Sequence, residues 1–595
     1  MAKRNVKIAS KTRTSGRKAR APKGARTAGA TQLSLAEMAP AAKAAAKPAS
    51  KPAAKPASKP AAPATPTSAA PARARKPVAH LSAQDMAARQ REISVSEFFT
   101  KNRHLLGFDS PAKALLTTVK EAVDNGLDAC EEAGILPDIL IEIQMISETR
   151  FRVAVQDNGP GIVKNQIPRV FGQLLYGSKF HRLRQSRGQQ GIGISAAGMY
   201  GQLTTGKPVT VISKTGAGKP AHRFEIQIDT KRNAPVPVED REQDWAPEHG
   251  TRVEVEIEAT YKKGRHSVDG YIEQTAIANP HARFSYTAPD GEVRVFERAT
   301  DQLPREPLEI QPHPHGVELG ILLKMLHDTK ARNLRSFLHG EFSRVSAAVA
   351  EEIARGASLS PDMAPHRAAR GDAEALYNAI QGTKIMAPPS NVLSPIAEEA
   401  LMNGLRQQVE ADFYAATSRS PAVYRGNPFL VEAALAYGGA HLPGDELITL
   451  LRFANRVPLL YQQSACAVTK SVVQTNWKAY GIQQSRGALP AAPMVLLVHI
   501  ASVWVPFTSE SKEAVASYPE IMKEIRLALQ DVGRKLGLFI RRGLREAEAE
   551  KKRSYIEKYI PHIGIALQEI LAISDKQKDK VCAVLKDTLE RSRTP

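Results

Sequence analysis

Residues 120–129 read Lys-Glu-Ala-Val-Asp-Asn-Gly-Leu-Asp-Ala, and this stretch decides the fold that we expect. Glu121 and Asn125 are four residues apart, so on a helix they lie on one face, one above the other. An asparagine carbonyl is a neutral hard oxygen that suits Mg²⁺ when phosphates supply most of the charge. A carboxylate one turn away can accept a proton from the water that attacks a γ-phosphate. The stretch therefore predicts a helix that presents a base and a metal ligand together.

A second segment follows the apolar-rich run at residues 151–155, where residues 157–161 read Asp-Asn-Gly-Pro-Gly. The carboxylate of Asp157 can accept a hydrogen bond from an exocyclic amine, which would distinguish adenine from guanine. Gly159 and Gly161 allow the backbone to approach a flat base closely. We expect this turn at the end of a strand to hold the base of a nucleotide.

A third segment, residues 188–195, reads Gly-Gln-Gln-Gly-Ile-Gly-Ile-Ser. Its three glycines let successive N–H groups point at phosphate oxygens. A helix that begins near Ile194 would add the positive end of its dipole to the same site. The sequence therefore predicts a phosphate-binding loop ahead of a helix.

Each segment alone has an ordinary explanation: a solvated helix face, a plain turn and a flexible loop. The ordered set of helix, strand end and loop-to-helix is far more specific, and it indicates one kind of nucleotide pocket. Residues 201–208 nearly match the pattern of a different nucleotide pocket, the P-loop. Pro208 stands there where Ser or Thr must bind Mg²⁺, and no strand is predicted before it, so we reject that site.

With these three segments the chain resembles the GHKL ATPase superfamily, and within it the family of B subunits of type IIB topoisomerases (topoisomerase VI). The resemblance runs from about Ser94 to beyond Arg553. Further stretches that carry it lie at residues 97–102, 170–179, 424–429, 451–459 and 476–481. The last three lie well outside the ATPase core, and they separate this family from other GHKL proteins.

The resemblance implies a role for each matching residue. Glu121 is the general base, Asn125 holds Mg²⁺ and Asp157 reads the adenine of ATP, with Gly161 close to the base. Lys478, from the downstream domain, reaches the γ-phosphate; without the surrounding motif it would be taken for a solvated surface lysine. Ser178 and Lys179 begin a lid, and the loop that wraps the phosphates consists of Gly188, Gln189, Gln190, Gly191, Ile192, Gly193, Ile194 and Ser195.

Two positions depart from the family pattern. The phosphate loop of the family usually ends in Lys, where this chain has Ser195; a hydroxyl can still donate one hydrogen bond, but a positive charge is lost from the phosphate site. Gly126 stands where the family commonly has Ser. A glycine inside a helix costs about 1 kcal/mol relative to Ala, and we interpret it as tolerated variation.

The composition excludes several classes of protein. Hydrophobic residues make up 42% of the chain, which suits buried cores. No apolar run reaches the ~18–20 residues of a membrane span, and the N-terminus lacks the apolar core of a signal peptide. The three cysteines are scattered, so we expect neither a disulfide framework nor a zinc site. A reducing, cytoplasmic setting fits, with association to the nucleoid.

Most of the net charge lies in the N-terminal tail. Residues 1–80 hold eighteen Lys and Arg against one acid, Glu37, and therefore carry +17 of the formal net charge of +21. The tail also lacks Phe, Tyr and Trp, so it cannot bury a core and should be disordered. Its charge would attract nucleic acid without sequence preference; a solubilising or targeting extension is the alternative.

We expect an α+β multidomain chain. A disordered basic Lys/Ala/Pro-rich tail covers residues 1–92, and a GHKL (Bergerat) ATPase domain, an α/β sandwich with an N-terminal strap, covers 93–315. The resemblance implies a helical helix–two-turns–helix insert at 316–389 and an α/β transducer domain with long C-terminal helices at 390–595. Residues 509–588 read as strongly helical. Strands are expected at residues 138–146, 151–156, 208–213, 223–228, 252–258 and 494–500.

The resemblance implies an ATP-hydrolysing subunit of a type IIB topoisomerase. Two B subunits form a homodimer on ATP, with the strap reaching across to the second copy, and trap a double-stranded DNA. They drive that duplex through a break made by an A subunit, within an A2B2 heterotetramer, which relaxes and decatenates DNA. The alternatives are another GHKL clamp of MutL-like or chaperone-like type, a histidine kinase, or a non-hydrolysing DNA-binding scaffold. No partnership with a membrane is expected.

Overall fold

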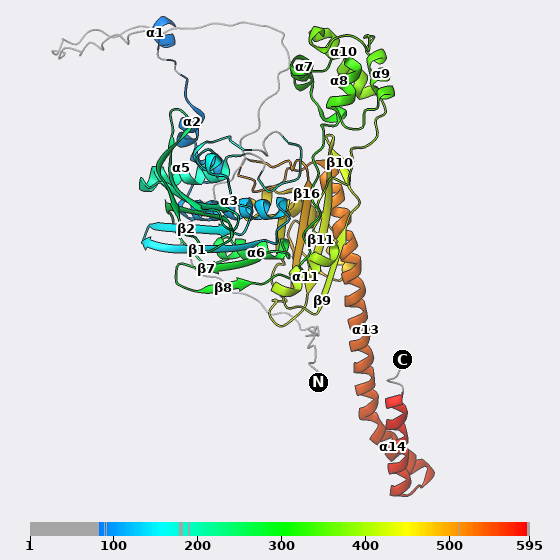
Figure 1. The fold of residues 1–595 in the computed structure, drawn as a ribbon. Coiled ribbons are helices and arrows are strands. Elements are labelled where there is room, and N and C mark those ends of the chain that lie inside the picture. Colours follow the sequence, from blue (N-terminus) through cyan, green and yellow to red (C-terminus); the bar gives the residue numbers. More distant parts are fainter. Residues whose placement is uncertain are drawn as a thin grey trace, which may run out of the picture. The chain divides into compact units, whose positions relative to one another are not determined.

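The structure is a computed structural model that describes residues 83–88, 90, 92–177, 182–188, 191–509 and 511–591 (Figure 1). Residues 1–82, most of the tail expected to be disordered, lie outside this range. The six-residue helix α1 (Ala83–Ala88) falls inside that tail, where the sequence predicted no regular structure. Among the described helices, none is both long enough and apolar enough to cross a bilayer.

An eight-stranded sheet organises the first-sheet region, residues 93–315. The strand order is β5-β4-β3-β6-β2-β1-β7-β8, and every neighbouring pair is antiparallel except β1 and β7. The strands are β1 (Asp138–Ser147), β2 (Arg150–Asp157), β3 (Val209–Thr215), β4 (Ala221–Asp229), β5 (Ala234–Gln243), β6 (His249–Glu258), β7 (Arg283–Thr287) and β8 (Val293–Phe296). The five strands expected in this region are confirmed, whereas β5, β7 and β8 were not foreseen.

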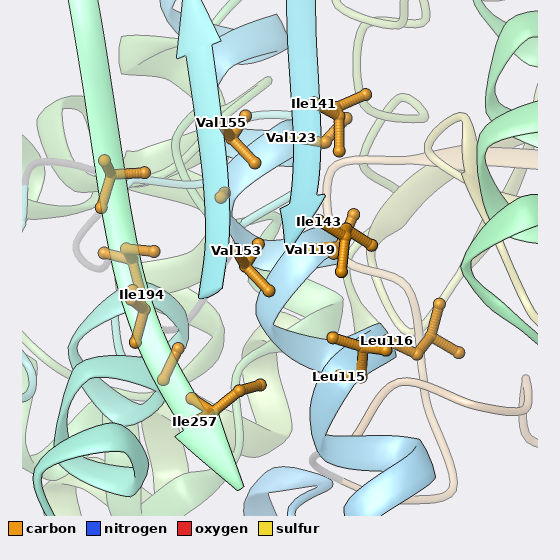
Figure 2. Close-up of a cluster of buried hydrophobic side chains, with 14 of the residues drawn as sticks. Leu115, Leu116, Val119, Val123, Ile141, Ile143, Val153, Val155, Ile194 and Ile257 are labelled. Atoms are coloured by element: carbon orange, nitrogen blue, oxygen red, sulfur yellow. The ribbon is translucent and has the colours of Figure 1, made fainter. Parts of the chain in front are cut away.

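Three helices carry most of the apolar surface that packs on this sheet. They are α3 (Pro111–Glu132), α5 (Gly193–Thr205) and α6 (Val268–Ala278). Figure 2 shows Leu115, Leu116, Val119 and Val123 of α3 with Ile141, Ile143, Val153 and Val155 of β1 and β2; all are nearly inaccessible to solvent. The apolar side chains of α3 recur every three to four residues, so one face of the helix is buried and Glu121 and Asn125 remain beside it.

The remaining helices of this region are short. The expected strap contains α2 (Val95–Lys101), which Ser94 caps by accepting a hydrogen bond from the N–H of Glu97, and the 3-10 turn η1 (Arg103–Leu106). Between the turn after β2 and the glycine loop lie η2 (Lys164–Gln166) and α4 (Ile167–Gly172).

Residues 314–383 form a helical region with a core of its own. Its elements are η3 (Pro314–Gly316), α7 (Leu319–Asp328), α8 (Leu334–Glu341), α9 (Ala347–Gly356), η4 (Pro365–Arg367) and α10 (Arg370–Gly382). Leu322, Phe337, Ile353 and Leu376 meet in that core, one from each helix, and are fully buried. This separate core supports our proposal that domain boundaries lie near residues 315 and 389.

A second sheet organises the second-sheet region, residues 390–591. Its strand path is β10-β11-β16-β12-β13, and β9 also pairs with β11. The strands are β9 (Phe413–Ser418), β10 (Ala422–Tyr424), β11 (Asn427–Tyr437), β12 (Thr449–Ala454), β13 (Val457–Pro458) and β16 (Met494–Ser502), with a small separate pair, β14 (Gln483–Gln484) and β15 (Pro490–Ala491). The strand expected at residues 494–500 is confirmed as β16, and all nine of its residues are buried.

The helices of this region are α11 (Glu398–Gln408), α12 (Ala467–Gln474), α13 (Pro519–Leu571) and α14 (Asp575–Arg591), with the turns η5 (Gln463–Ala465) and η6 (Trp477–Tyr480). The long helix α13 is drawn in orange and leads to α14 (Figure 1). Helix was expected from residue 509, but α13 begins only at Pro519. The described residues between 507 and 518 form a loop instead, with an isolated bridge between Phe507 and Val515.

Candidate functional site

A cavity of about 330 Å³ opens in the first-sheet region beside α3. Glu121 and Asn125 both line it, as their four-residue spacing predicts. The cavity is also lined by residues from the strand end and from the glycine loop. The lining residues that the sequence singled out are Glu121, Asn125, Gly126, Asp157, Gly161, Gly188, Gly191, Ile192, Gly193, Ile194 and Ser195. Ser178, Lys179, Gln189 and Gln190 lie outside the described residues.

The strand-end carboxylate is held in place by the backbone. Asp157 ends β2, and its Oδ1 accepts hydrogen bonds from the N–H of Gly159 at 2.9 Å and of Thr251 at 3.2 Å. Burial outweighs these bonds and raises the pKa of Asp157 to about 6. Gly161 has φ +71°, and a Cβ there would lie 2.1 Å from the carbonyl oxygen of Lys214. The turn therefore requires glycine and brings a fixed acceptor to one side of the cavity.

The glycine loop approaches the helix carboxylate more closely than a side chain would allow. A Cβ on Gly193 would lie 1.7 Å from Oε2 of Glu121, and one on Gly188 would lie 3.9 Å from Oδ1 of Asn125. Gly193 is also the first residue of α5, whose leading N–H groups have no partner within the helix. The arrangement places free N–H donors and the positive helix end next to Glu121, which suits a bound phosphate.

Ser195 does not use its hydroxyl as the sequence led us to expect. The side chain is 2% exposed, and its Oγ lies 3.0 Å from the carbonyl oxygen of Val170 and 3.2 Å from that of Gln173. A hydroxyl has one proton to donate, and here it donates to these carbonyl groups. The side chain therefore anchors α5 to the end of α4, and only the backbone of Ser195 remains for a phosphate.

Lys478, to which the resemblance assigns the γ-phosphate, is not among the described residues that line the cavity in this structure. It lies in η6, and its side chain is exposed. The neighbouring aromatic residues explain this position. Trp477 is fully buried and donates from Nε1 to the carbonyl of Val472 at 2.9 Å, and Tyr480 packs against Gly533 of α13. The turn is thus fixed to the second-sheet core with its lysine pointing away from that core.

Lys512 is the lysine that the second-sheet region brings to the described lining of the cavity. It lines the cavity together with Ser511 and Glu513, and it is only 8% exposed. Its Nζ donates to the carbonyl of Arg187, immediately before the glycine loop, at 3.3 Å. The backbone of Lys512 is left-handed, with φ +52°, a strained conformation of the kind that collects at functional sites.

An ion pair and a ring contact hold this loop against α3. Lys113 of α3 pairs with Glu513, and the Nζ of Lys113 lies 5.3 Å from the ring centroid of Tyr461, which also lines the cavity. The polar run at residues 508–513, which follows the buried strand β16 and the apolar segment 503–507, could have indicated a loop. It was missed because the helical pattern of residues 519–588 was extended backwards over it.

Lys120 is a second cationic group that sequence reasoning missed. It lines the cavity next to Glu121, and burial lowers the pKa of its amine, in spite of the carboxylates of Glu121 and Asp124. Asp124 accepts a hydrogen bond from the hydroxyl of Tyr271 at 3.0 Å, and burial raises the pKa of Asp124 to about 6. The cavity is therefore lined by lysines from other segments, Lys113, Lys120 and Lys512, although the glycine loop itself ends in Ser195.

Gly126 is constrained by packing. A Cβ at this position would lie 3.1 Å from Cβ of Asp157 and 3.2 Å from Cδ1 of Ile139. Both distances are shorter than ordinary van der Waals contact, so a side chain here requires its neighbours to shift by a few tenths of an ångström. Gly126 therefore lies at a close approach between α3 and the strands that carry Asp157 and Ile139.

Comparison with known proteins agrees with this geometry. The family described as histidine kinase-, DNA gyrase B-, and HSP90-like ATPase matches residues 111–261, the part of the chain with α3, the strand end and the glycine loop. The family described as the topoisomerase VI B subunit transducer matches residues 388–552, which include the loop with Lys512.

Three relatives, each named as the B subunit of type 2 DNA topoisomerase 6, match most of the chain. The proteins from Methanosarcina barkeri and Methanococcoides burtonii are 51% and 52% identical over 490 residues, which are 82% of this chain and 79% of each relative. The protein from Pyrococcus horikoshii is 39% identical over 536 residues, 82% of this chain and 93% of that relative. Identity at this level over most of both chains, together with the two domain matches and the geometry of the cavity, shows that the chain belongs to the family of type 2 DNA topoisomerase 6 B subunits, with a GHKL ATPase domain and a transducer.

Proposed function

We propose that the cavity binds ATP with Mg²⁺ and hydrolyses it, and that this reaction drives the passage of one DNA duplex through another. The single observation that carries the proposal is the convergence of Glu121, Asn125, Asp157 and the start of α5 on one cavity. Membership of a family of ATP-dependent topoisomerase subunits supports the proposal that ATP hydrolysis in this cavity changes DNA topology.

Each group in the cavity has a role that its position supports. Asp157, held by two backbone N–H groups, accepts a hydrogen bond from the adenine amine. The backbone of the glycine loop and the N-terminus of α5 bind the phosphates. Glu121 accepts a proton from the attacking water, and its closeness to Gly193 places it next to the phosphate loop.

Asn125 is the residue that would hold Mg²⁺. It supplies one neutral oxygen to the cavity, and no group of three or more His, Cys, Asp or Glu side chains that could hold a metal occurs in the described part of the chain. This donor set fits Mg²⁺, which takes few protein ligands when phosphates and water complete its shell. Bound Mg²⁺ would neutralise charge on the phosphates.

We propose Lys512, rather than Lys478, as the lysine that contacts the terminal phosphate. Lys512 lies in the cavity and is buried, whereas Lys478 is exposed on η6. A lysine ammonium next to a γ-phosphate stabilises the charge of a loose transition state. Because Lys512 comes from the transducer, it also makes the position of the transducer sensitive to whether ATP or ADP is bound.

The finer assembly is also a proposal. Two copies of the chain close on ATP through the strap, and the dimer joins two A subunits in an A2B2 heterotetramer around double-stranded DNA. ATP can drive closure only to the extent that it binds the closed state more tightly than the open state. The basic tail adds sequence-independent DNA affinity, and the complex lies on the nucleoid.

The test is ATP hydrolysis and supercoil relaxation by this chain, with and without its A subunit, for wild type and Asn125→Ala. Relaxation that requires both chains, ATP and Asn125 supports the proposal. Hydrolysis without relaxation in the presence of the A subunit would favour another GHKL clamp, and an absence of hydrolysis would favour a DNA-binding scaffold.

The choice between the two lysines is tested by Lys512→Ala against Lys478→Ala. We expect Lys512→Ala to lower kcat for ATP by at least about tenfold and Lys478→Ala to leave kcat within about twofold. The opposite ranking would show that Lys478 reaches the nucleotide in the working state.

A further inference from the structure

A buried charge network lies behind the glycine loop, at the end of α3 opposite to the strap. Glu131, in the last turn of α3, accepts hydrogen bonds from Arg187 at 2.6 and 3.0 Å and from Arg456 at 3.3 Å. Arg187 also donates to Asp128 at 2.7 Å. Arg187 belongs to the segment before the glycine loop, and Arg456 belongs to the turn between β12 and β13 of the transducer. One carboxylate therefore connects the ATPase domain to the transducer.

The charges of this network balance. The side chains of Arg187 and Arg456 are 3% and 5% exposed, and they face the carboxylates of Asp128 and Glu131. Burial is the largest influence and opposes ionisation of Glu131, but Arg187, His281 and Arg456 together outweigh it and hold the pKa of Glu131 well below its usual range. His281 lies 2.7 Å from Glu131, and burial lowers its pKa. A paired and dry network of this kind has one favourable geometry, because each buried charge depends on its partner.

The chain just before the glycine loop is attached to the transducer at three consecutive residues. Gln185 exchanges two hydrogen bonds with the backbone of Ser394, at 2.8 and 2.9 Å. The carbonyl of Ser186 accepts from Asn455 at 3.1 Å, and the carbonyl of Arg187 accepts from Lys512 at 3.3 Å. The next residue, Gly188, opens the phosphate loop. The entrance to that loop therefore moves with the transducer.

Arg456 is itself fixed within the transducer. Its guanidinium donates to Oγ of Ser394 at 2.7 Å and to the carbonyl of Pro395 at 3.2 Å. Its backbone N–H donates to Nε2 of His499 at 3.0 Å, so His499 is neutral and its Nδ1 donates to Glu432 at 2.9 Å. Glu432 lies on β11 and His499 lies on β16, which are neighbouring strands of the second sheet. Because of these hydrogen bonds, Arg456 moves together with the second sheet when that sheet rotates.

We propose that Glu131, Arg187 and Arg456 form a positioning site that couples the transducer to ATP hydrolysis. The site holds the loop entrance, α3 and the loop of Lys512 in one arrangement. The inference rests on the proposed function of the cavity. Glu131 acts through other groups. It lies in the helix that carries Glu121 and Asn125. It also binds Arg187, whose carbonyl accepts a hydrogen bond from Lys512. Loss of the network should leave the adenine site intact and displace Lys512 relative to the phosphate loop.

The main test is Arg456→Gln, which removes the charge on the transducer side. We expect the Kd for a non-hydrolysable ATP analogue to stay within about twofold and kcat for ATP to fall roughly tenfold or more, because the reacting groups are misplaced. The number of DNA relaxation events per ATP hydrolysed should also fall. Arg419→Gln is the matched control, since it breaks a transducer ion pair with Glu524 and Asp531 away from the cavity; its kcat should remain within about twofold of wild type.

A double-variant cycle separates positioning from general loss of structure. If Arg456 acts through Lys512, the variant Arg456→Gln with Lys512→Ala should be no slower than Lys512→Ala alone. Losses of kcat that multiply would overturn the proposal. Ser394→Ala, which removes one acceptor of Arg456 and keeps every charge, should give a smaller loss of the same kind if Arg456→Gln does not fold.

The outcome also separates this inference from the proposed function. If Asn125→Ala abolishes hydrolysis while Arg456→Gln and Ser394→Ala leave kcat and the relaxation events per ATP unchanged, the network is only structural and the cavity remains the ATP site. If Asn125→Ala hydrolyses ATP like the wild type, the proposed function itself is wrong.

Discussion

Glu121 and Gly193 depend on each other at the scale of single residues. The carboxylate reaches the phosphate loop only because residue 193 has no side chain, and a Cβ there would lie 1.7 Å from Oε2 of Glu121. The same absence of a side chain leaves the first N–H groups of α5 open to a phosphate. The proposed base and the backbone proposed to bind the phosphates thus lie next to each other.

Glu121→Ala should abolish ATP turnover and spare ATP binding. We expect kcat to fall at least about 100-fold, the usual scale for a general base, with the Kd for ATP changed by less than about threefold. Steady-state hydrolysis and calorimetric titration with ATP measure the two effects. If turnover persists, Glu121 is not the base.

Gly193→Ala should damage the same step through geometry. Either Glu121 or the start of α5 must move to admit the Cβ, so we expect at least about a 100-fold loss in kcat. Gly320→Ala in α7 is the matched control, because it lies near the start of a helix and nothing lies within 4 Å of its Cβ. The control should be as active as the wild type; equal activity of both variants would exclude the close approach that the structure shows.

The affinity for ATP should weaken at acidic pH. The pKa of Asp157 is raised to about 6, so its carboxylate is ionised at pH 7.5 and increasingly protonated below pH 6. Because the adenine amine donates to the ionised form, each pH unit below about 6 should weaken ATP binding up to tenfold. The Coulombic interaction with His249 lowers the pKa of Asp157 and offsets part of the effect of burial. Calorimetric titration at pH 5.5 and 7.5 measures it, and Asp157→Asn should lack this part of the pH dependence.

At the scale of elements, α3 connects the core to the site. Its buried face packs on β1 and β2 (Figure 2). Glu121 and Asn125 of the same helix line the cavity, and its last turn carries Glu131 of the charge network. The four-residue spacing of Glu121 and Asn125 predicted the face that this helix presents to the cavity. The loop between β16 and α13 had no such pattern, so its place in the cavity was not foreseen.

Val119→Ala should lower the free energy of unfolding of the first-sheet region by about 2 kcal/mol, from lost apolar burial and the cavity left behind. Val119 is fully buried on the face of α3 that packs on the sheet, two residues before Glu121. Val163→Ala, at a site that is 60% exposed, is the control and should stay within about 0.5 kcal/mol of wild type. Thermal unfolding compares them; an equal Tm for both would show that α3 is not held by this core.

At the scale of the whole molecule, the strap offers an unpaired apolar surface. Ile93, Val95 and Phe98 are 38%, 38% and 41% exposed in the single chain. A second copy that covered these side chains would remove apolar surface from water, which favours association. The proposal that ATP closes two copies on each other depends on this segment.

Phe98→Asp should prevent ATP-dependent dimerisation, because it would bury a charge in the contact between the two copies. Light scattering with a non-hydrolysable ATP analogue should find wild type as a dimer and Phe98→Asp as a monomer. Its affinity for the analogue in the monomer should be unchanged, since Phe98 does not line the cavity. A dimeric variant would place the contact elsewhere on the molecule.

The sequence by itself determined the parts of the site that depend on short-range spacing. Glu121 and Asn125 share a face because a helix repeats every 3.6 residues, and Asp157 with the glycine loop follows from turn chemistry within a few residues. The first sheet was foreseen only where strands alternate; edge strands such as β5, with two prolines and little burial, gave no signal.

Only the tertiary structure decided which lysine reaches the cavity and what holds the glycine loop. Lys512 meets Arg187, and Arg456 meets Glu131, across 325 residues of chain in each case. No local pattern encodes such contacts, because they depend on how two sheets pack, and the resemblance pointed to Lys478, which the packing of Trp477 turns outward. The physical reason is that spacing along the chain fixes neighbours within a helix or turn, whereas burial of two separate cores fixes neighbours between domains.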